Sequence, residues 1–431
     1  MAAADDIQSI PLATAPARSM QKLIDWCEKG TFAGLCVATV LLGVGRLEFT
    51  APKGSMSAWS VSRTTFFFWL IYRSLILLSR GRPRLDWAAL APWAPLFAFF
   101  MIVSISLLPN LRIAGDYRYF VFACAHAAMV ADLFAQPARR KWLIYAMGVA
   151  PLVLVARGFF HDPDIFSFHV GPRFAFPLDH PNTAGYLLSM SLPLCLLAAS
   201  AERGWRRGIA LVSLAGQLPA LMLTHSRGAW LGASVAIIVL GSLAKKWRFL
   251  LVMFLLAAVS VAAFPPLRQR AATLLRPQSD QSISDRVELA NDAMQIAMDK
   301  PVLGIGYGRG RLKEALRQRY QGTEDENSPI WHTHNVYIEL CAETGFLGLA
   351  IFLWLAGDIL RRLLRRVRAP SSSQAMVGMA LAASWSAALV AGLGDVPFYH
   401  HETRIFFFSL IALAYLYARD ADGDMPIARH S

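Results

Sequence analysis

Polar side chains crowd the stretch from Trp331 to Gly348, where a long polar loop meets an apolar run. The ionisable and amide members of this stretch are His332, His334, Asn335, Glu339 and Glu343. Histidine exchanges a proton near neutral pH, and ionisable groups at the head of a membrane helix are expensive to keep there. We interpret the stretch as the catalytic edge of an active site at a water–membrane boundary.

The two histidines are open to three interpretations. A neutral histidine can act as a general base, and a nearby arginine would hold its pKa low. A zinc site would have to recruit His400, His401 and Glu402 to His332 or His334, without the close ligand spacing that zinc sites show. A histidine that caps a helix or lies at the interface needs no chemistry at all. We favour the general base and predict no metal.

Two arginines on the same side of the membrane suggest an anionic ligand. Arg227 follows a short turn that begins at Thr224 between two apolar segments, and Arg286 opens a helix of the long loop. Guanidinium is always charged and matches phosphate oxygens bidentately, and helix N-termini favour anions. The pair therefore suits a pyrophosphate, with ordinary loop salt bridges as the structural alternative.

A further polar segment contains Arg173, His180 and Asn182 and leads into an apolar run. Pro181 suits the first turn of a helix, and we expect Asn182 or Thr183 to cap it. Contact with a substrate and a purely structural role are equally compatible with this pattern.

Four alternating glycines, beginning at Gly304 and ending at Gly310, predict a flexible turn. The stretch lacks the terminal Gly-Lys-Ser/Thr of a P-loop and does not have the dinucleotide-binding spacing. A basic helix follows, in which Arg309 and Arg311 are candidates for contact with phosphates or with the anionic membrane surface.

Composition places the chain among membrane proteins. Of its 431 residues 55% are hydrophobic and 16% are charged, and the formal net charge is +13. In so apolar a chain, the excess of Lys and Arg belongs to cytoplasmic loops. No nucleic-acid-binding motif is present. The five cysteines form no C-x-x-C pair, so we expect free thiols. Residues 1–22 lack the apolar core of a signal peptide.

Hydropathy predicts an all-α polytopic protein with about twelve transmembrane helices. The expected spans are 31–46, 64–79, 88–108, 117–134, 141–158, 182–200, 206–224, 227–244, 247–266, 334–356, 374–393 and 405–419. We therefore divide the chain into a tail (1–30), helices one to nine (31–266), a loop (267–333), helices ten to twelve (334–419) and a second tail (420–431).

Basic clusters follow every even-numbered span. Their members are Arg80, Arg82 and Arg84; Arg139, Arg140 and Lys141; Arg203, Arg206 and Arg207; Lys245, Lys246 and Arg248; and Arg361, Arg362, Arg365, Arg366 and Arg368. By the positive-inside rule these loops and both termini are cytoplasmic. The loop 267–333 then lies in the periplasm of a bacterial inner-membrane protein.

Two amphipathic helices are expected in that loop. Ser282 to Asp285 has the form of a helix start. The expected apolar face of the first helix is formed by Val287, Ala290, Met294 and Met298, and that of the second by Leu312, Ala315, Leu316 and Tyr320.

Four groups of residues, taken together, resemble the bacterial O-antigen ligase family, which is related to the O-antigen polymerases. They are Thr224-His225-Ser226-Arg227-Gly228-Ala229-Trp230; Arg286 with Lys300-Pro301-Val302-Leu303-Gly304-Ile305-Gly306; His334-Asn335 leading into Glu343-Thr344-Gly345-Phe346-Leu347-Gly348; and Arg173 with His180-Pro181-Asn182. Their order agrees with the family over residues 160–355.

The resemblance implies a glycosyltransferase-C-like helical fold and an enzyme that needs neither nucleotide nor metal. It implies transfer of a glycan from undecaprenyl pyrophosphate to a sugar hydroxyl of lipid A-core, in lipopolysaccharide biosynthesis at the periplasmic face. The family's histidine maps onto His334 and its paired arginines onto Arg227 and Arg286. His332 is an additional histidine here, so the base is one of the two.

Two other functions remain open from the sequence. An O-antigen polymerase would use the same donor and lengthen a lipid-linked glycan. A transporter or flippase would show inverted repeats and charges at the membrane midplane. The distinctive polar residues of this chain gather at one membrane face, which favours chemistry at an interface.

Overall fold

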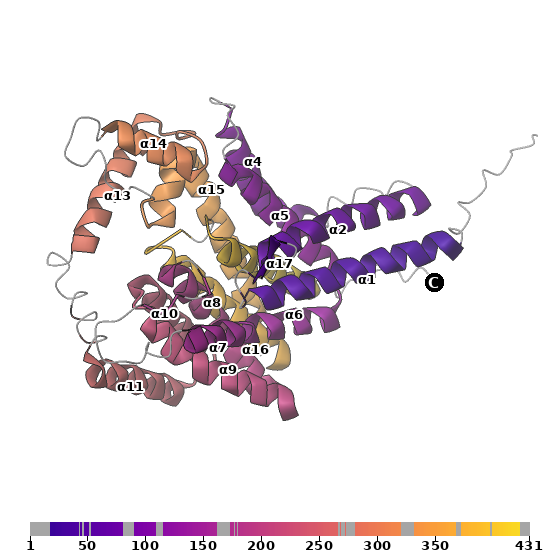
Figure 1. Cartoon of the computed structure of the whole chain (residues 1–431), viewed down its shortest axis with the longest axis horizontal. Helices are drawn as coiled ribbons and strands as arrows, with labels where there is room; N and C mark the ends of the chain where they lie inside the picture. The colour runs from indigo at the N-terminus through magenta and orange to yellow at the C-terminus, as the bar shows by residue number, and fades with distance from the viewer. Residues whose placement is uncertain are drawn as a thin grey trace, which may run out of the picture.

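The structure is a computed structural model, and it is built almost entirely from helices (Figure 1). It describes residues 18–42, 44, 47–50, 53–80, 90–108, 115–161, 173–175, 177–178, 180–265, 268, 272, 281–319, 332–367, 372–396 and 399–422. Tyr320, Trp331, Arg82, Arg84, Arg368 and the last nine residues of the chain lie outside the described residues.

Every expected span overlaps one or two helices. The helices are α1 (Arg18–Leu41), α2 (Ala58–Arg80), η1 (Ala91–Trp93), α4 (Ala94–Ile105), α5 (Gly115–Leu133), α6 (Pro137–Val149), α7 (Pro151–His161), α8 (Pro181–Ala201), α9 (Gly204–Leu223), α10 (Arg227–Leu243), α11 (Trp247–Ala263), α13 (Gln281–Asp299), α14 (Arg309–Arg319), α15 (Val336–Val367), α16 (Ser372–Ala391) and α17 (His401–Asp422).

Five of the described helical segments are long and apolar enough to cross a membrane on their own. They are Ala58–Ser79, Pro137–His161, Pro181–Ala201, Val336–Val367 and Gln374–Ala391. Shorter apolar helices include Arg227–Leu243. The chain is thus a multi-pass helical membrane protein, and the number of twelve crossings stays a prediction.

Two features near the N-terminus differ from expectation. Helix α1 begins at Arg18, well before the expected start at residue 31. Its buried residues Ile24, Cys27, Thr31 and Leu35 recur at helical spacing. The first turns also carry polar residues on their outer face, so they do not form the wholly apolar run from which spans were predicted. A short antiparallel hairpin, β1 (Leu47–Thr50) and β2 (Lys53–Met56), joins α1 to α2.

Small residues let the central helices approach closely. Helix α8 packs against α6, α9, α10 and α16, and α10 packs on α16. A β-carbon on Gly185 would meet the Ala229 side chain, and one on Gly232 would meet the backbone of Ala387 and the side chain of Ala391. Without a hydrophobic effect between helices in lipid, such close van der Waals packing holds a membrane bundle together.

The loop helices are confirmed, but the expected face of the first one is wrong. In α13 the buried residues are Ala293, Ile296 and Ala297, whereas Val287 and Met298 are exposed. The expected and the observed residues both recur at helical spacing. The small side chains of Ala293 and Ala297 in the observed set allow α13 to approach α15 closely. In α14 the expected residues Leu312 and Leu316 are buried against this contact, as the sequence predicts.

A break within α15 receives the glycine-rich turn. Gly345 has φ 72° and ψ 178°, which interrupts the helix. The carbonyl groups of Ala342 and Glu343 accept hydrogen bonds from the backbone N–H groups of Ile305 (3.0 Å) and Gly306 (2.8 Å). The expected turn is therefore present but docked by backbone hydrogen bonds. In Figure 1, α13 and α14 lie with this part of α15 at the upper left.

Candidate active site

The histidines lie on a constrained segment just before α15. His334 has φ 54°, a left-handed conformation that is uncommon for a residue with a β-carbon. The preceding Thr333 donates from its backbone N–H (2.8 Å) and from its hydroxyl (2.6 Å) to the same carboxylate oxygen of Glu339. Both residues are buried, so the two hydrogen bonds hold the histidine-bearing segment against the first turn of α15.

Asn335 caps α15. Its side-chain oxygen accepts hydrogen bonds from the backbone N–H groups of Tyr337 (3.0 Å) and Ile338 (3.2 Å), which otherwise lack partners at a helix start. The backbone N–H of Val336 donates to the carbonyl of Gly392 at 2.8 Å. This bond joins the start of α15 to the turn that follows α16.

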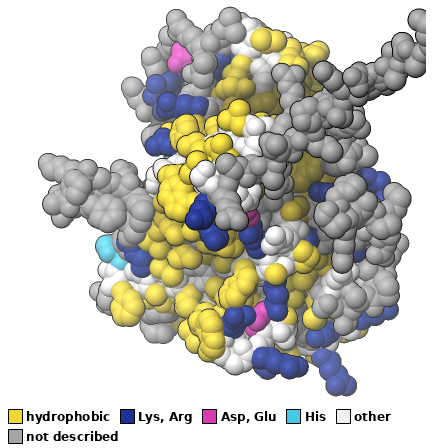
Figure 2. Space-filling view, turned by 90° about the vertical axis from the view of Figure 1, so that its right-hand side faces the viewer, with side chains coloured by type: hydrophobic (Ala, Val, Ile, Leu, Met, Phe, Trp, Pro, Cys, Tyr) yellow, Lys and Arg dark blue, Asp and Glu magenta, His cyan; other side chains and the backbone are white. Residues whose placement is uncertain are grey.

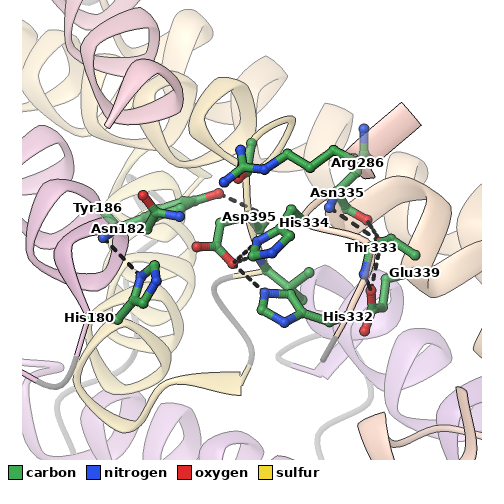
Figure 3. Close-up of polar contacts among 12 residues, drawn as sticks. His180, Asn182, Tyr186, Arg286, His332, Thr333, His334, Asn335, Glu339 and Asp395 are labelled. Atoms are coloured by element: carbon green, nitrogen blue, oxygen red, sulfur yellow. Dashed lines mark hydrogen bonds and ion pairs between the residues drawn. The ribbon is translucent and has the colours of Figure 1, made fainter. Parts of the chain in front are cut away.

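Asp395, in that turn, is the partner of both histidines (Figure 3). His332 Nε2 lies 2.8 Å and His334 Nδ1 lies 3.8 Å from Asp395 Oδ1. The rings of His332 and His334 are 4.0 Å apart between centroids. The side chains of Asp395, His332 and His334 are 2%, 10% and 21% exposed, respectively. His334 is thus the more accessible of the two histidines.

The surroundings of His334 favour its neutral form. Burial lowers its pKa below the ordinary value of 6.5, and the positive charges of His332 and Arg286 act in the same direction, whereas Asp395 opposes them. For Asp395, burial by itself would raise the pKa, but the contacts with His332 and His334 hold it well below its usual range. The site therefore holds an ionised carboxylate next to a neutral imidazole.

Of the two candidate phosphate-binding arginines, Arg286 contacts this turn with its side chain, and Arg227 is adjacent in sequence to a residue that packs on the turn. Arg286 Nη1 lies 3.5 Å from the carbonyl oxygen of Gly394. Arg227 opens α10, and the next residue, Gly228, is so close to the turn that a β-carbon on it would lie 3.2 Å from Gly394 Cα. The fold thus brings Arg286 and both histidines together around Gly394 and Asp395, and places the start of α10, which Arg227 opens, beside the same turn.

The third polar segment joins the same cluster. Arg173 Nη2 donates to the Asn182 side-chain oxygen (3.2 Å), and Arg173 Nε donates to the carbonyl of Thr224 (2.8 Å). The expected cap is wrong: His180, not Asn182 or Thr183, caps α8, because its Nδ1 accepts the N–H of Asn182 at 3.2 Å. Burial lowers the pKa of His180, and its charged neighbours include Asp395 and both site histidines.

The basic helix lies farther along α15. Arg311 Nη1 donates to the carbonyl of Ile305 (3.3 Å), so this side chain folds back over the docked turn. Its charged neighbour Glu343 accepts a hydrogen bond from the Tyr399 hydroxyl. Arg309 opens α14, and its side chain lies outside the described part of the structure.

The geometry also bears on metal binding. His332, His334 and Asp395 offer ligand atoms within 4.8 Å of one another. Two ligands of one tetrahedral zinc ion lie roughly 3.3–3.5 Å apart, given metal–ligand distances of about 2.0–2.2 Å. The His332–Asp395 distance of 2.8 Å is shorter and matches a shared proton. His401, which the zinc hypothesis recruits, instead stacks on Trp59.

Glu339 belongs to the catalytic stretch expected from the sequence, but its contact with Thr333 was not predicted, and Asp395 was not predicted to belong to the site. Asp395 lies between two apolar segments, and the sequence alone identifies no partner for its carboxylate. The signal was its place in a short Gly-Leu-Gly-Asp turn between α16 and α17, where an acid needs a reason to be buried.

The helical bundle, with a largely buried cluster of His332, His334 and Asp395 close to Arg286, defines a polytopic membrane protein with a candidate active site. A family model described as O-antigen ligase matches residues 209–353, about a third of the chain, and this match supports a relationship to that family. The match includes Arg227, Arg286 and His334, and it ends before Asp395. No curated protein gives a significant match to the chain.

Proposed function

We propose that the protein is an O-antigen ligase that takes its glycan from undecaprenyl pyrophosphate and transfers it to a sugar hydroxyl of lipid A-core. The reaction takes place at the periplasmic face of the bacterial inner membrane, with inversion at the anomeric carbon and without a metal. The observation that carries the proposal is the convergence of His334, Asp395 and Arg286 on one turn, within a chain that matches this family model.

The arginines supply the electrostatic part of the mechanism. The glycosyl–pyrophosphate bond already stores the energy, so the site has to position the substrates and stabilise the charge that grows on the leaving group. Arg227 and Arg286 would bind the pyrophosphate oxygens from either side of the turn at Gly394. Their permanent charge makes them suited to a diphosphate in the absence of a metal ion.

His334 acts as the general base. It takes the proton of the acceptor hydroxyl while that oxygen attacks the anomeric carbon and the carbon–oxygen bond to the pyrophosphate breaks. Asp395 stabilises the imidazolium that forms, in the role that a carboxylate plays behind a catalytic histidine. His332, hydrogen-bonded to Asp395, fixes the position of that carboxylate.

The other candidate residues surround this centre. Arg173, His180 and Asn182 form a connected group that can meet the donor sugar. Asn335 shapes the site chiefly by starting α15. Arg309 and Arg311 in α14 are the candidates for binding the phosphates of the lipid A-core acceptor.

A reconstituted assay tests the proposal. Purified protein is given lipid-linked glycan and lipid A-core, and we expect labelled glycan on lipid A-core. A lengthened lipid-linked glycan instead would show that the protein is the related polymerase, which shares the donor chemistry. Movement of lipid-linked glycan across liposomes with neither product would indicate a transporter and overturn the proposal.

A further inference from the structure

A cavity of about 600 Å³ opens at the end of the bundle far from the histidines. Helix α8 connects the two sites: His180 caps its start in the candidate active site, and its last turns line the cavity. At a rise of 1.5 Å per residue, its 21 residues span roughly 30 Å, which is the thickness of a bilayer core. The cavity therefore lies at the opposite membrane interface and is separate from the transfer site.

Positive charge dominates the lining of the cavity. The charged residues are Arg140, Lys141, Arg203 and Arg207, against the single carboxylate of Glu202. That carboxylate already pairs with Lys141 at 3.2 Å and with Arg206 at 3.8 Å. The exposed Arg203 and Arg207 form no ion pair within the described part of the chain. The rim thus presents charge that an anion would neutralise.

Helix dipoles add to this charge. Helix α6 begins at Pro137, α9 begins directly after Arg203, and α16 begins at Ser372, and residues of all three N-terminal turns line the cavity. Each helix N-terminus carries a partial positive charge and backbone N–H groups that bind anions. The buried Arg140 of α6 donates to the carbonyl of Leu416 in α17 (2.9 Å) and to that of Ala135 just before α6 (3.1 Å). It thus connects these two segments at the cavity.

The walls and surroundings of the cavity are suited to a lipid. Apolar side chains line its interior, namely Ile144, Leu194, Leu197, Ala198, Met376 and Val377. Nearby, Arg206 lies over the ring of Trp142, 4.2 Å from its centroid, and both Trp142 and Trp205 are largely exposed. Exposed tryptophans mark the depth of the membrane–water interface.

Figure 2 shows Lys and Arg side chains along the lower part of one face, near a broad hydrophobic area.

We propose that this cavity binds an anionic phospholipid. The phosphate of the headgroup lies among Arg203, Arg207 and the N-termini of α6, α9 and α16, and an acyl chain follows the apolar wall of α8. Basic pockets between transmembrane helices at the cytoplasmic interface recognise such headgroups. This site takes no part in glycan transfer, so the proposal stands independently of the proposed function.

Native mass spectrometry of the full chain in detergent tests the proposal. Phosphatidylglycerol is titrated against the protein, with phosphatidylcholine as the zwitterionic lipid and inorganic phosphate as the free anion. We expect one tightly bound phosphatidylglycerol. In the double variant Arg203→Gln/Arg207→Gln its affinity should fall by roughly tenfold or more, since each cation near an anionic headgroup contributes to binding.

Two further variants make the test specific. Lys246→Gln/Arg248→Gln removes the same number of cations from another exposed basic turn, and it should leave the affinity unchanged. Ser200→Trp places a bulky uncharged side chain at the lining of the cavity, and it should abolish binding without a change in charge. The melting temperature without added lipid checks that each variant is folded.

Three results would overturn the proposal. Equal affinity for phosphatidylcholine would show that charge is not recognised. Displacement of phosphatidylglycerol by inorganic phosphate at equal concentration would define a site for free phosphate. An equal loss of affinity in Lys246→Gln/Arg248→Gln would reduce the effect to general surface electrostatics.

Discussion

At the scale of single residues, the two histidines differ in exposure and in their contact with Asp395. His332 forms the short hydrogen bond and is the more buried, whereas His334 is turned into a left-handed conformation at the more open side. A strained backbone persists only where surrounding contacts hold it, and such positions cluster at functional sites. Glu339 provides that support through Thr333.

The first prediction separates the two histidines. His334→Ala should bind the lipid-linked donor normally but lose roughly 10²–10⁴-fold in transfer rate, the usual contribution of a general base. His332→Ala should be milder, because it removes only a support of Asp395. Donor binding and transfer are measured separately. A dead His332→Ala with an active His334→Ala would move the base to position 332.

The second prediction concerns pH. Because His334 must be neutral to accept a proton and its pKa is lowered, transfer should be lost only as the pH falls below 6.5. Arg286→Gln removes a charge that lowers this pKa, so the acidic limb should move to higher pH. Asp395→Asn removes a charge that raises it, so the limb should move to lower pH.

The midpoints of the pH–rate profiles, rather than the rates, check this prediction. Arg317→Gln, a matched change at an exposed position of α14, should leave the midpoint where it is. Shifts of Arg286→Gln and Asp395→Asn in the same direction would contradict the role of His334 as the titrating group.

The third prediction concerns metal. Since the His332–Asp395 distance matches a shared proton, extensive dialysis against EDTA should leave the transfer rate within about twofold of the untreated enzyme. The rate is measured before and after chelation. Loss of activity that one divalent ion restores would contradict this prediction and would indicate that His332, His334 and Asp395 bind a metal ion.

At the scale of elements, the break in α15 joins two stretches that the sequence analysis singled out separately. Gly345 supplies the positive φ, and the carbonyls that its kink releases bind the turn at Ile305 and Gly306. A β-carbon on Gly345 would clash with the carbonyl of Val302. The loop that carries Arg286 is thereby anchored to the helix that follows His334.

The fourth prediction tests this anchor. Gly345→Ala should destabilise the protein by about 1–3 kcal/mol from the backbone alone, with a further cost from the clash, and should impair transfer. Gly357→Ala is the matched control in the same helix, since its β-carbon meets nothing within 4 Å. Thermal unfolding in detergent compares the two, and equal melting temperatures would show that the anchor is dispensable.

At the scale of the whole molecule, residues of two basic clusters meet at the end remote from the histidines. Arg140, Lys141, Arg203 and Arg207 line one cavity there. Such segregation of positive charge to one end of a membrane bundle is what the positive-inside rule describes, and it supports a cytoplasmic assignment for that end.

The fifth prediction tests the orientation. A membrane-impermeant maleimide should label Ser284→Cys, on the exposed start of α13, from the periplasm. It should label Ser200→Cys, at the exposed end of α8, only after the inner membrane is disrupted. All five native cysteines are free and buried or half-buried, so the background should be low. The reverse pattern would invert the topology.

The helices of this protein could be predicted from its sequence. Every expected span overlaps one or two helices, because a long apolar run in a membrane must satisfy its own backbone hydrogen bonds. The residue types at His334, Arg227 and Arg286 likewise indicated their chemistry, since few side chains titrate near neutral pH or carry a permanent bidentate charge. These properties belong to single residues and to local segments.

Only the tertiary structure decided which of these groups meet. Asp395 lies 63 residues from His332 in sequence, and periodicity carries no information about a pairing over that distance. The buried face of α13 was predicted wrongly for the same reason, because two sets of its residues have helical spacing and the docking against α15 selects one. The same holds for the cap at His180 and for the turn at Gly394, where contacts between distant segments, rather than local preference, determine the site.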